Sequence, residues 1–421
     1  MMMHKSSVVS VFMCFWMLGA IISNVFISYL YYNPYISLVI YIFPLLFFLV
    51  PLFFSVDKSQ SFSLYVKSLF LYLLLFLMFH VFNGKELFVI IFGLLDNFKF
   101  LLVLLVTIAI FDNKINLNYL GKNTLNLSYN VILLGVLFGF FQQINNELIY
   151  FFESSVDYKY DYRYGILRVP SFYTNVNAFA KVSFLLIPLA VVLDKDLKFP
   201  LCVAIFAFTL TFSRQFIVGM FISTIVAAYH SGLFTKKNTK TIILSTLSFM
   251  MFVLIIVING DDDYRNSEHD GQLLSIPTTF IRGAVATTSV NAANDNPVFG
   301  VGSGYFGGNI GSRYAINEEL ENYGLMNLIP FFDIEYFYLD TQLFQLLGEF
   351  GYFGFGLLMF SFVIWNRKIT QFDCSEKNKF FAYLVFYQFV FSAFLSPVFN
   401  FPYYSIPSLF LTYFIVSKDN V

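Results

Sequence analysis

The chain has 421 residues, of which 58% are hydrophobic and 12% are charged, and its formal net charge is −1. A water-soluble core could not hide this much apolar sequence, so the composition excludes an ordinary soluble domain and indicates a polytopic membrane protein. No nucleic-acid partner is expected. The cysteines Cys14, Cys202 and Cys374 have no CxxC spacing, so neither a disulfide framework nor a zinc site is predicted.

Apolar runs of about 20 residues, the length that a helix needs to cross a bilayer, recur along the chain. Helices are the predicted element, because lipid offers the backbone no other hydrogen-bond partner and no segment alternates like a barrel strand. The first run lacks a small-residue cleavage pattern before Tyr31 and is interpreted as a span rather than a signal peptide. The predicted fold class is all-α, with about twelve transmembrane helices near residues 7–30, 35–55, 61–82, 87–111, 128–150, 176–193, 198–212, 215–230, 241–259, 342–365, 380–397 and 402–416.

The positive charges of alternating loops predict the orientation. Loops on the side of the N-terminus hold most of them, namely Lys5, Lys58, Lys114, Lys122, Lys195, Lys198, Lys236, Lys237, Lys240, Arg367, Lys368, Lys377, Lys379 and Lys418. The short opposite loops hold Lys85, Lys159, Arg163, Arg168 and Arg214. Both termini are therefore predicted to be cytoplasmic. Helices 1–9 occupy residues 1–259, a large outer loop residues 260–341, and helices 10–12 residues 342–421.

Several charged or polar residues fall inside the predicted spans. Asp96 and Lys99 lie three residues apart and are expected to pair on one helix face. Lys181 follows Asn177 by four residues, so both share a face at the start of a span. A polar cluster from Gln142 to Glu147 is interpreted as a polar lining or as an early helix end.

The large outer loop is acidic but also contains Arg265, Arg282 and Arg313. Its carboxylates lack an EF-hand spacing or a histidine pair, so no metal site is predicted. Arginines on an acidic background favour a bound phosphate. A GxGxxG from Gly302 to Gly307 follows no strand of a strand-helix-strand unit, so a dinucleotide site is rejected, and its glycines are expected to allow close backbone approach.

Two motifs precede this loop. The first covers residues 168–177 and reads RVPSFYTNVN, which resembles the R-x-x-G-x-F-x-N-P-N stretch of the O-antigen polymerase and ligase superfamily, with Ser171 in place of the glycine and Val176 in place of the proline. The second covers residues 211–214 and reads TFSR, which is similar to the family's T-x-S-R.

Two further motifs follow in the family's order. The third covers residues 296–302 and reads NPVFGVG, similar to N-P-L-x-G-x-G, with Arg282 upstream where the family usually has an arginine. The fourth covers residues 340–351 and reads DTQLFQLLGEFG, which resembles H-N-x-x-L-Q-x-L-x-E-x-G. Asp340 occupies the position of the histidine of the ligases, which favours the polymerase branch.

The resemblance implies a metal-independent glycosyltransferase of the bacterial inner membrane that uses no cofactor and acts on its periplasmic side. Its substrates would be undecaprenyl pyrophosphate-linked oligosaccharides, with the growing glycan transferred to the sugar hydroxyl of a new lipid-linked repeat unit. Membrane lipid and a chain-length regulator protein are further expected partners. The alternatives are an O-antigen ligase, which delivers the glycan to the lipid A core, and a lipid-linked oligosaccharide flippase, although the chain lacks the repeated halves common in transporters.

Candidate site residues follow from the motifs. Arg214 and Arg282 are expected to clamp the leaving pyrophosphate, because the guanidinium fork binds phosphate oxygens in two places. Asp340 is the candidate general base, with a helix N-cap as the alternative interpretation. The substrate-binding candidates are Arg168, Asn175, Asn177, Gly300 and Gly302.

Overall fold

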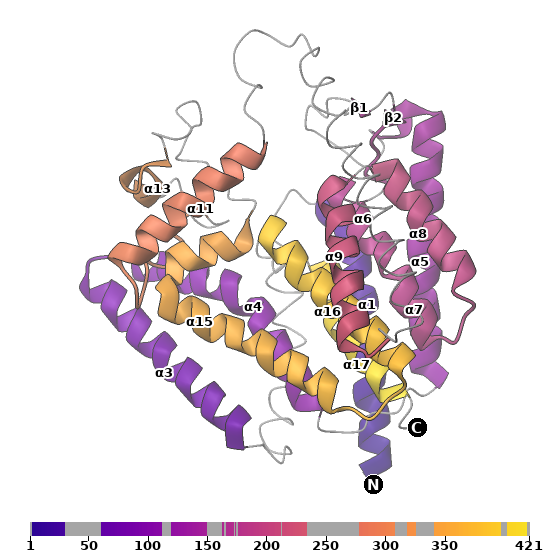
Figure 1. The fold of residues 1–421 in the computed structure, drawn as a ribbon, viewed down its shortest axis with the longest axis horizontal. Helices are drawn as coiled ribbons and strands as arrows, with labels where there is room; N and C mark the ends of the chain where they lie inside the picture. Colours follow the sequence, from indigo (N-terminus) through magenta and orange to yellow (C-terminus); the bar gives the residue numbers. More distant parts are fainter. Residues whose placement is uncertain are drawn as a thin grey trace.

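The computed structural model describes residues 2–29, 60–111, 119–149, 162–163, 166–171, 173, 176–211, 213–233, 278–307, 318–325, 341–396 and 402–418. The predicted spans at 35–55 and 241–259 lie outside these residues. The described part is a bundle of α-helices with one short β-hairpin (Figure 1). Its helices are α1 (Met2–Tyr29), α3 (Gln60–Phe82), α4 (Leu87–Phe111), α5 (Tyr119–Ile144), α6 (Val176–Phe184), α7 (Leu186–Val192), α8 (Lys198–Thr211), α9 (Arg214–His230), α11 (Thr278–Asp295), α13 (Glu318–Asn322), α15 (Gln342–Gln371), α16 (Glu376–Leu395) and α17 (Pro402–Ser417).

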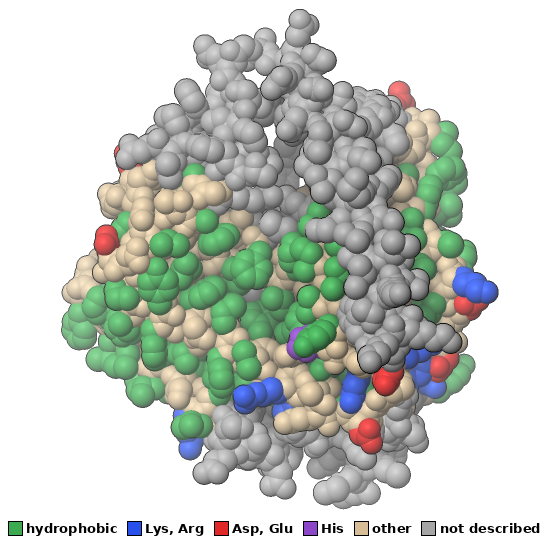
Figure 2. Space-filling model, viewed as in Figure 1, with side chains coloured by type: hydrophobic (Ala, Val, Ile, Leu, Met, Phe, Trp, Pro, Cys, Tyr) green, Lys and Arg blue, Asp and Glu red, His purple; other side chains and the backbone are tan. Residues whose placement is uncertain are grey.

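Four helical segments of the described part are long and apolar enough to cross a membrane, namely Leu64–Phe82, Leu87–Ile108, Tyr119–Ile144 and Gln342–Gln371. Much of α3 is apolar yet exposed, including Leu64, Phe70 and Met78. Such a surface is unfavourable in water and favourable in lipid. Figure 2 shows a broad hydrophobic area on one face, with most of the visible Lys and Arg side chains below it, toward the end where α1 begins. These features support a membrane location.

The centre of the bundle is α17, whose residues are all buried. It packs against α1, α4, α7 and α16. A helix that is apolar on every side must be surrounded by other helices, as this one is.

Polar contacts define two ends of the bundle. At one end Lys195 donates to Asn126 near the start of α5, and Lys418 binds Asp194. At the other end Gln142 of α5 donates to the carbonyl of Ser171 at 2.9 Å. The β-hairpin, formed by β1 (Tyr162–Arg163) and β2 (Ile166–Leu167), also lies at the second end, opposite the start of α1 (Figure 1). We call the second end the outer end.

Two predicted spans differ in detail from the helices. The helix expected from residue 128 already begins at Tyr119, and it ends at Ile144, before the short 3-10 helix Asn146–Ile149. The span expected at 176–193 is divided into α6 and α7 at Leu185. Pro188 explains this interruption, because its ring lacks an N–H donor and clashes with the carbonyl four residues earlier in a continuous helix.

The large outer loop contains structure that its sequence did not predict. Helix α11 packs along α15, and α13 lies beside it (Figure 1). A separate hydrophobic cluster joins them, formed by Ala284, Val285, Ala292, Val301, Phe306, Leu320 and Leu325. Part of this segment therefore folds around a core of its own at the outer end.

Candidate functional site

Helix α15 is broken at Gly351, within the fourth motif. Gly351 has φ 65° and ψ −176°, which lies outside the helical region. The break leaves α15 carbonyls without partners inside the helix, and the third motif supplies them. Val301 donates its N–H to the carbonyl of Gly348 at 3.1 Å, and Gly302 donates to the carbonyl of Glu349 at 3.2 Å. In return Phe353 donates its N–H to the carbonyl of Pro297 at 3.1 Å. The third and fourth motifs thus form one backbone unit.

Glycines make this close approach possible. A Cβ at Gly300, whose φ is 60°, would lie 2.4 Å from the carbonyl oxygen of Gly348. A Cβ at Gly348 would lie 2.4 Å from the ring of Phe306. We call residues 296–307 the glycine loop. The backbone approach expected from its glycines is observed, and the contact is with α15.

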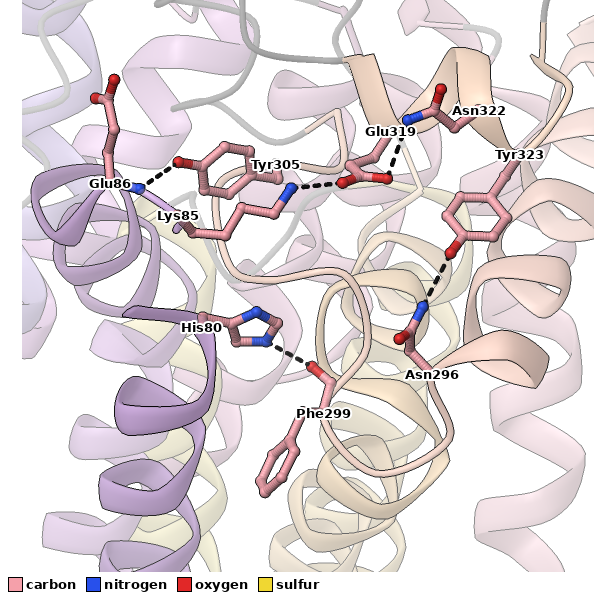
Figure 3. A network of polar contacts seen from close by, with 9 residues as sticks. All are labelled: His80, Lys85, Glu86, Asn296, Phe299, Tyr305, Glu319, Asn322 and Tyr323. Carbon is pink, nitrogen blue, oxygen red and sulfur yellow. Dashed lines mark hydrogen bonds and ion pairs between the residues drawn. The ribbon is translucent and has the colours of Figure 1, made fainter. Parts of the chain in front are cut away.

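Helix α3 holds the glycine loop from the other side (Figure 3). The hydroxyl of Tyr72 lies 2.9 Å from the carbonyl oxygen of Phe350 and 3.2 Å from that of Val298, so it bridges α15 and the loop. Nε2 of His80 lies 3.1 Å from the carbonyl oxygen of Phe299. These side chains are buried. They therefore provide hydrogen-bond partners for buried backbone carbonyls of the glycine loop and α15.

The turn between α3 and α4 also binds α13 (Figure 3). Nζ of Lys85 lies 2.5 Å from Oε1 of Glu319 and 4.3 Å from the ring centre of Tyr305. The Tyr305 hydroxyl accepts the N–H of Glu86 at 2.8 Å. Burial raises the pKa of Tyr305 and of Tyr323, whose hydroxyl accepts from Nδ2 of Asn296 at 2.9 Å. The contacts place Lys85 and Glu319 on the same side of the bundle, as the loop alternation predicts.

A buried polar cluster lies beneath the glycine loop. It joins Asn97 of α4, Ser303 of the loop, and Gln345 and Glu349 of α15 through side-chain hydrogen bonds. On the same helix as Asn97, Nζ of Lys99 binds Oδ1 of Asp96 at 2.5 Å. The predicted pairing of Asp96 with Lys99 is confirmed.

The first and second motifs form another cluster at the outer end. Nε of Arg168 donates to the carbonyl of Thr211 at 2.7 Å, and Ser213 donates to Oδ1 of Asn177 at 2.7 Å. Lys181, one turn after Asn177, donates to Oγ of Ser396 at 2.6 Å, which connects this cluster to the outer end of α16.

Ser171 of the first motif adopts a backbone conformation that favours glycine. Its φ is 59°, in the left-handed region that disfavours residues with a Cβ. Oγ of Ser171 donates to the carbonyl of Gly135 at 2.5 Å, and its own carbonyl accepts from Gln142. These bonds to α5 hold the serine in the conformation that a glycine adopts without cost.

The predicted site residues are described to different extents. Arg168 is buried, Asn177 is half-buried, and both belong to the cluster of the first two motifs, whereas Gly300 and Gly302 are buried in the glycine loop. Arg214 is the first residue of α9 and Arg282 lies near the start of α11, but their side chains lie outside the described part. Asn175 and Asp340 lie outside it entirely. The roles assigned to all of these residues stay predictions.

No role was predicted from the sequence for the side chains that organise this region, Tyr72, His80, Asn97, Ser303 and Glu349. A signal existed for three of them, because His80, Asn97 and Glu349 are polar residues within apolar spans, where such residues usually face the protein interior. Glu349 also matches the glutamate of the fourth motif. Tyr72 gave no such signal among so many aromatic residues.

The four motifs therefore meet in pairs, and both pairs lie at the outer end. Comparison with models of known protein families and with curated protein sequences finds no match.

Proposed function

We propose that this chain is a surface-polysaccharide polymerase of the O-antigen type. It transfers a growing glycan from undecaprenyl pyrophosphate to the sugar hydroxyl of a new lipid-linked repeat unit. The bundle has about twelve transmembrane helices and cytoplasmic termini, and the reaction takes place at its periplasmic face. A chain-length regulator is an expected partner.

The observation that carries the proposal is the pairwise docking of the four motifs. The third and fourth motifs exchange backbone hydrogen bonds at the break of α15, and the first and second are joined by Arg168 and Ser213. Segments distant in the sequence therefore converge at the end opposite to Lys195 and Lys418. A lipid-linked substrate requires a site at one membrane surface, and this end is the one that the charge distribution places outside the cytoplasm.

The proposed chemistry assigns the leaving pyrophosphate to arginine. Arg214 is the last residue of the second motif and Arg282 precedes the third, so both belong to segments that reach the outer end. Their guanidinium groups would stabilise the negative charge that develops on the leaving phosphate. Asp340, two residues before α15 in the sequence, would accept the proton of the attacking hydroxyl.

Deletion of the gene tests the polymerase assignment. We expect surface glycan that carries a single repeat unit still attached to lipid A, visible as one band above the unsubstituted lipid on a gel. Loss of all attached repeats would instead identify a ligase. Accumulation of lipid-linked units in the cytoplasmic leaflet would identify a flippase.

Arginine variants test the site. Arg214→Ala and Arg282→Ala, each introduced into the deletion strain, should abolish chain growth while the protein remains in the membrane at its normal level. The control is Arg367→Ala, an exposed arginine at the opposite end of α15, which should restore the full ladder. Normal ladders in both outer variants would overturn the clamp.

A further inference from the structure

The carboxyl group of Glu349 connects three segments of the chain and is fully buried. Its Oε2 accepts from Nδ2 of Asn97 at 2.5 Å and from Oγ of Ser303 at 3.1 Å, and its Oε1 accepts from Nε2 of Gln345 at 3.0 Å. Asn97 belongs to α4, Ser303 to the glycine loop and Gln345 to α15, and each is at most 2% exposed. The carboxyl group of Glu349 therefore accepts hydrogen bonds from α4, the glycine loop and α15.

Such a group is costly to bury unless it is well bonded. Transfer of a polar group from water to a protein interior is unfavourable when no hydrogen bonds compensate for those lost to water. Here a further bond, from Nδ2 of Asn97 to Oγ of Ser303 at 2.9 Å, closes the cluster. α4 and the glycine loop are also in close backbone contact, because a Cβ at Gly93 of α4 would lie 2.6 Å from Gly304 N.

The position of Glu349 explains what the cluster controls. Its backbone carbonyl accepts the N–H of Gly302, so the same residue binds the glycine loop through both backbone and side chain. Gly351, where α15 breaks, lies two residues further on. The orientation of the outer half of α15, residues 342–350, therefore depends on how the glycine loop packs against it. Asp340 lies two residues before this half of the helix.

We propose that Glu349 is a positioning residue that locks the glycine loop to α4 and to the outer half of α15. It acts as a hydrogen-bond acceptor and not as a proton carrier. The effect on catalysis rests on the proposed polymerase function, whereas the effect on the loop does not.

Gln345 allows the role of Glu349 as a hydrogen-bond acceptor to be distinguished from a role as a proton carrier. Its Oε1 has no hydrogen-bond partner within the described residues. In a Glu349→Gln variant the amide of Gln345 can turn, so that this oxygen accepts from the introduced carboxamide nitrogen. The introduced carbonyl oxygen keeps the bonds from Asn97 and Ser303, and only the 3.4 Å bond from Gln345 to Asn97 is lost. Glu349→Leu has a similar size but removes every acceptor.

Hydrogen exchange measures the seating of the loop without any assumption about activity. The probes are the amides of Val301 and Gly302 in the purified full-length protein. We expect exchange to be at least about 10-fold faster in Glu349→Leu, since loss of about 1.4 kcal/mol corresponds to that factor. Glu349→Gln should stay within about threefold of the wild type, as should the control Glu321→Gln, an exposed carboxylate on α13. Unchanged exchange in Glu349→Leu would overturn the proposal.

Ser303→Ala covers the case in which Glu349→Leu does not accumulate. It removes only the hydroxyl of the loop and should accelerate exchange at Val301 by about threefold or more, because one buried bond is lost. Wild-type exchange in this variant would equally overturn the proposal.

Elongation kinetics provide the catalytic readout, with the lipid-linked repeat unit isolated from the deletion strain as substrate. We expect kcat of Glu349→Leu to fall by about 100-fold with little change in KM, because a displacement of about 1 Å in a site costs on the order of that factor. Glu349→Gln should keep at least about a third of the wild-type kcat. An equal loss in both variants would assign proton transfer to Glu349 and overturn its positioning role. If the wild-type protein does not elongate the substrate, the proposed function fails, and the exchange measurements still decide whether Glu349 seats the loop.

Discussion

Replacing Gly351 by alanine should destabilise the protein by about 2–6 kcal/mol. The φ of 65° and ψ of −176° belong to a region that costs a residue with a Cβ about 1–3 kcal/mol. The new Cβ would also lie 2.5 Å from the carbonyl oxygen of Asn296 and 2.8 Å from that of Pro297. Both oxygens are already engaged, by the N–H groups of Gly300 and Phe353. Relief of this overlap adds about 1–3 kcal/mol, as in other overpacked sites.

Thermal unfolding of the purified protein in detergent measures this cost. Domains of 150–250 residues lose about 2–4 °C per kcal/mol and a chain of this length about 1 °C, so we expect the midpoint to fall by about 2–7 °C. The control is Gly356→Ala in the same helix, where the site is exposed and a Cβ would meet no atom within 4 Å. That change should stabilise the helix by about 0.5–1 kcal/mol. Equal midpoints for the two variants would refute the assignment of the break to the backbone conformation of Gly351.

The remaining predictions concern the two described ion pairs at or near the site. Asp96→Asn removes the carboxylate that binds the buried Lys99, so it should cost about 3–5 kcal/mol of stability, and adding Lys99→Met should recover most of the loss in the same unfolding assay. Lys85→Glu should loosen α13 by about 1 kcal/mol, because its pair with Glu319 is partly exposed, and limited proteolysis should cleave α13 faster. The double variant Lys85→Glu with Glu319→Lys should restore resistance, and its failure to do so would mean that the pair does not hold α13.

Hydropathy predicted the apolar helices of the described part to within a few residues in most cases, because lipid and helical backbone constrain such sequences strongly. The alternation of loops between successive spans also predicted that Lys85 and the large loop share one side, and Lys85 contacts Glu319. Helix α11 was not predicted. Its sequence is rich in alanine and threonine and has little hydropathic contrast, so its stability comes from packing on α15, which sequence alone does not reveal.

The motifs marked segments that the structure brings into contact, but they did not reveal the contacts of individual residues. Position 300 requires glycine because a Cβ there would overlap the carbonyl oxygen of Gly348. Glu349 is needed because it accepts hydrogen bonds from α4 and the glycine loop. Neither contact can be inferred from the sequence. Ser171 is the opposite case. The resemblance marked it as a departure from glycine, and its φ of 59° lies in the region that glycine adopts most easily. A sequence comparison reveals the substitution, but the hydrogen bonds to α5 that stabilise the serine are tertiary contacts, which a sequence does not show.

The interruption of α15 also limits where this protein can be recombined. The carbonyls of Gly348 and Glu349 are paired by amides of the glycine loop, so neither segment keeps these buried hydrogen bonds without the other. A chimera that exchanges the loop but retains its own α15, or the reverse, would leave these groups without partners. Productive crossover points should therefore fall before residue 296 or after residue 353, so that both segments are inherited from one parent.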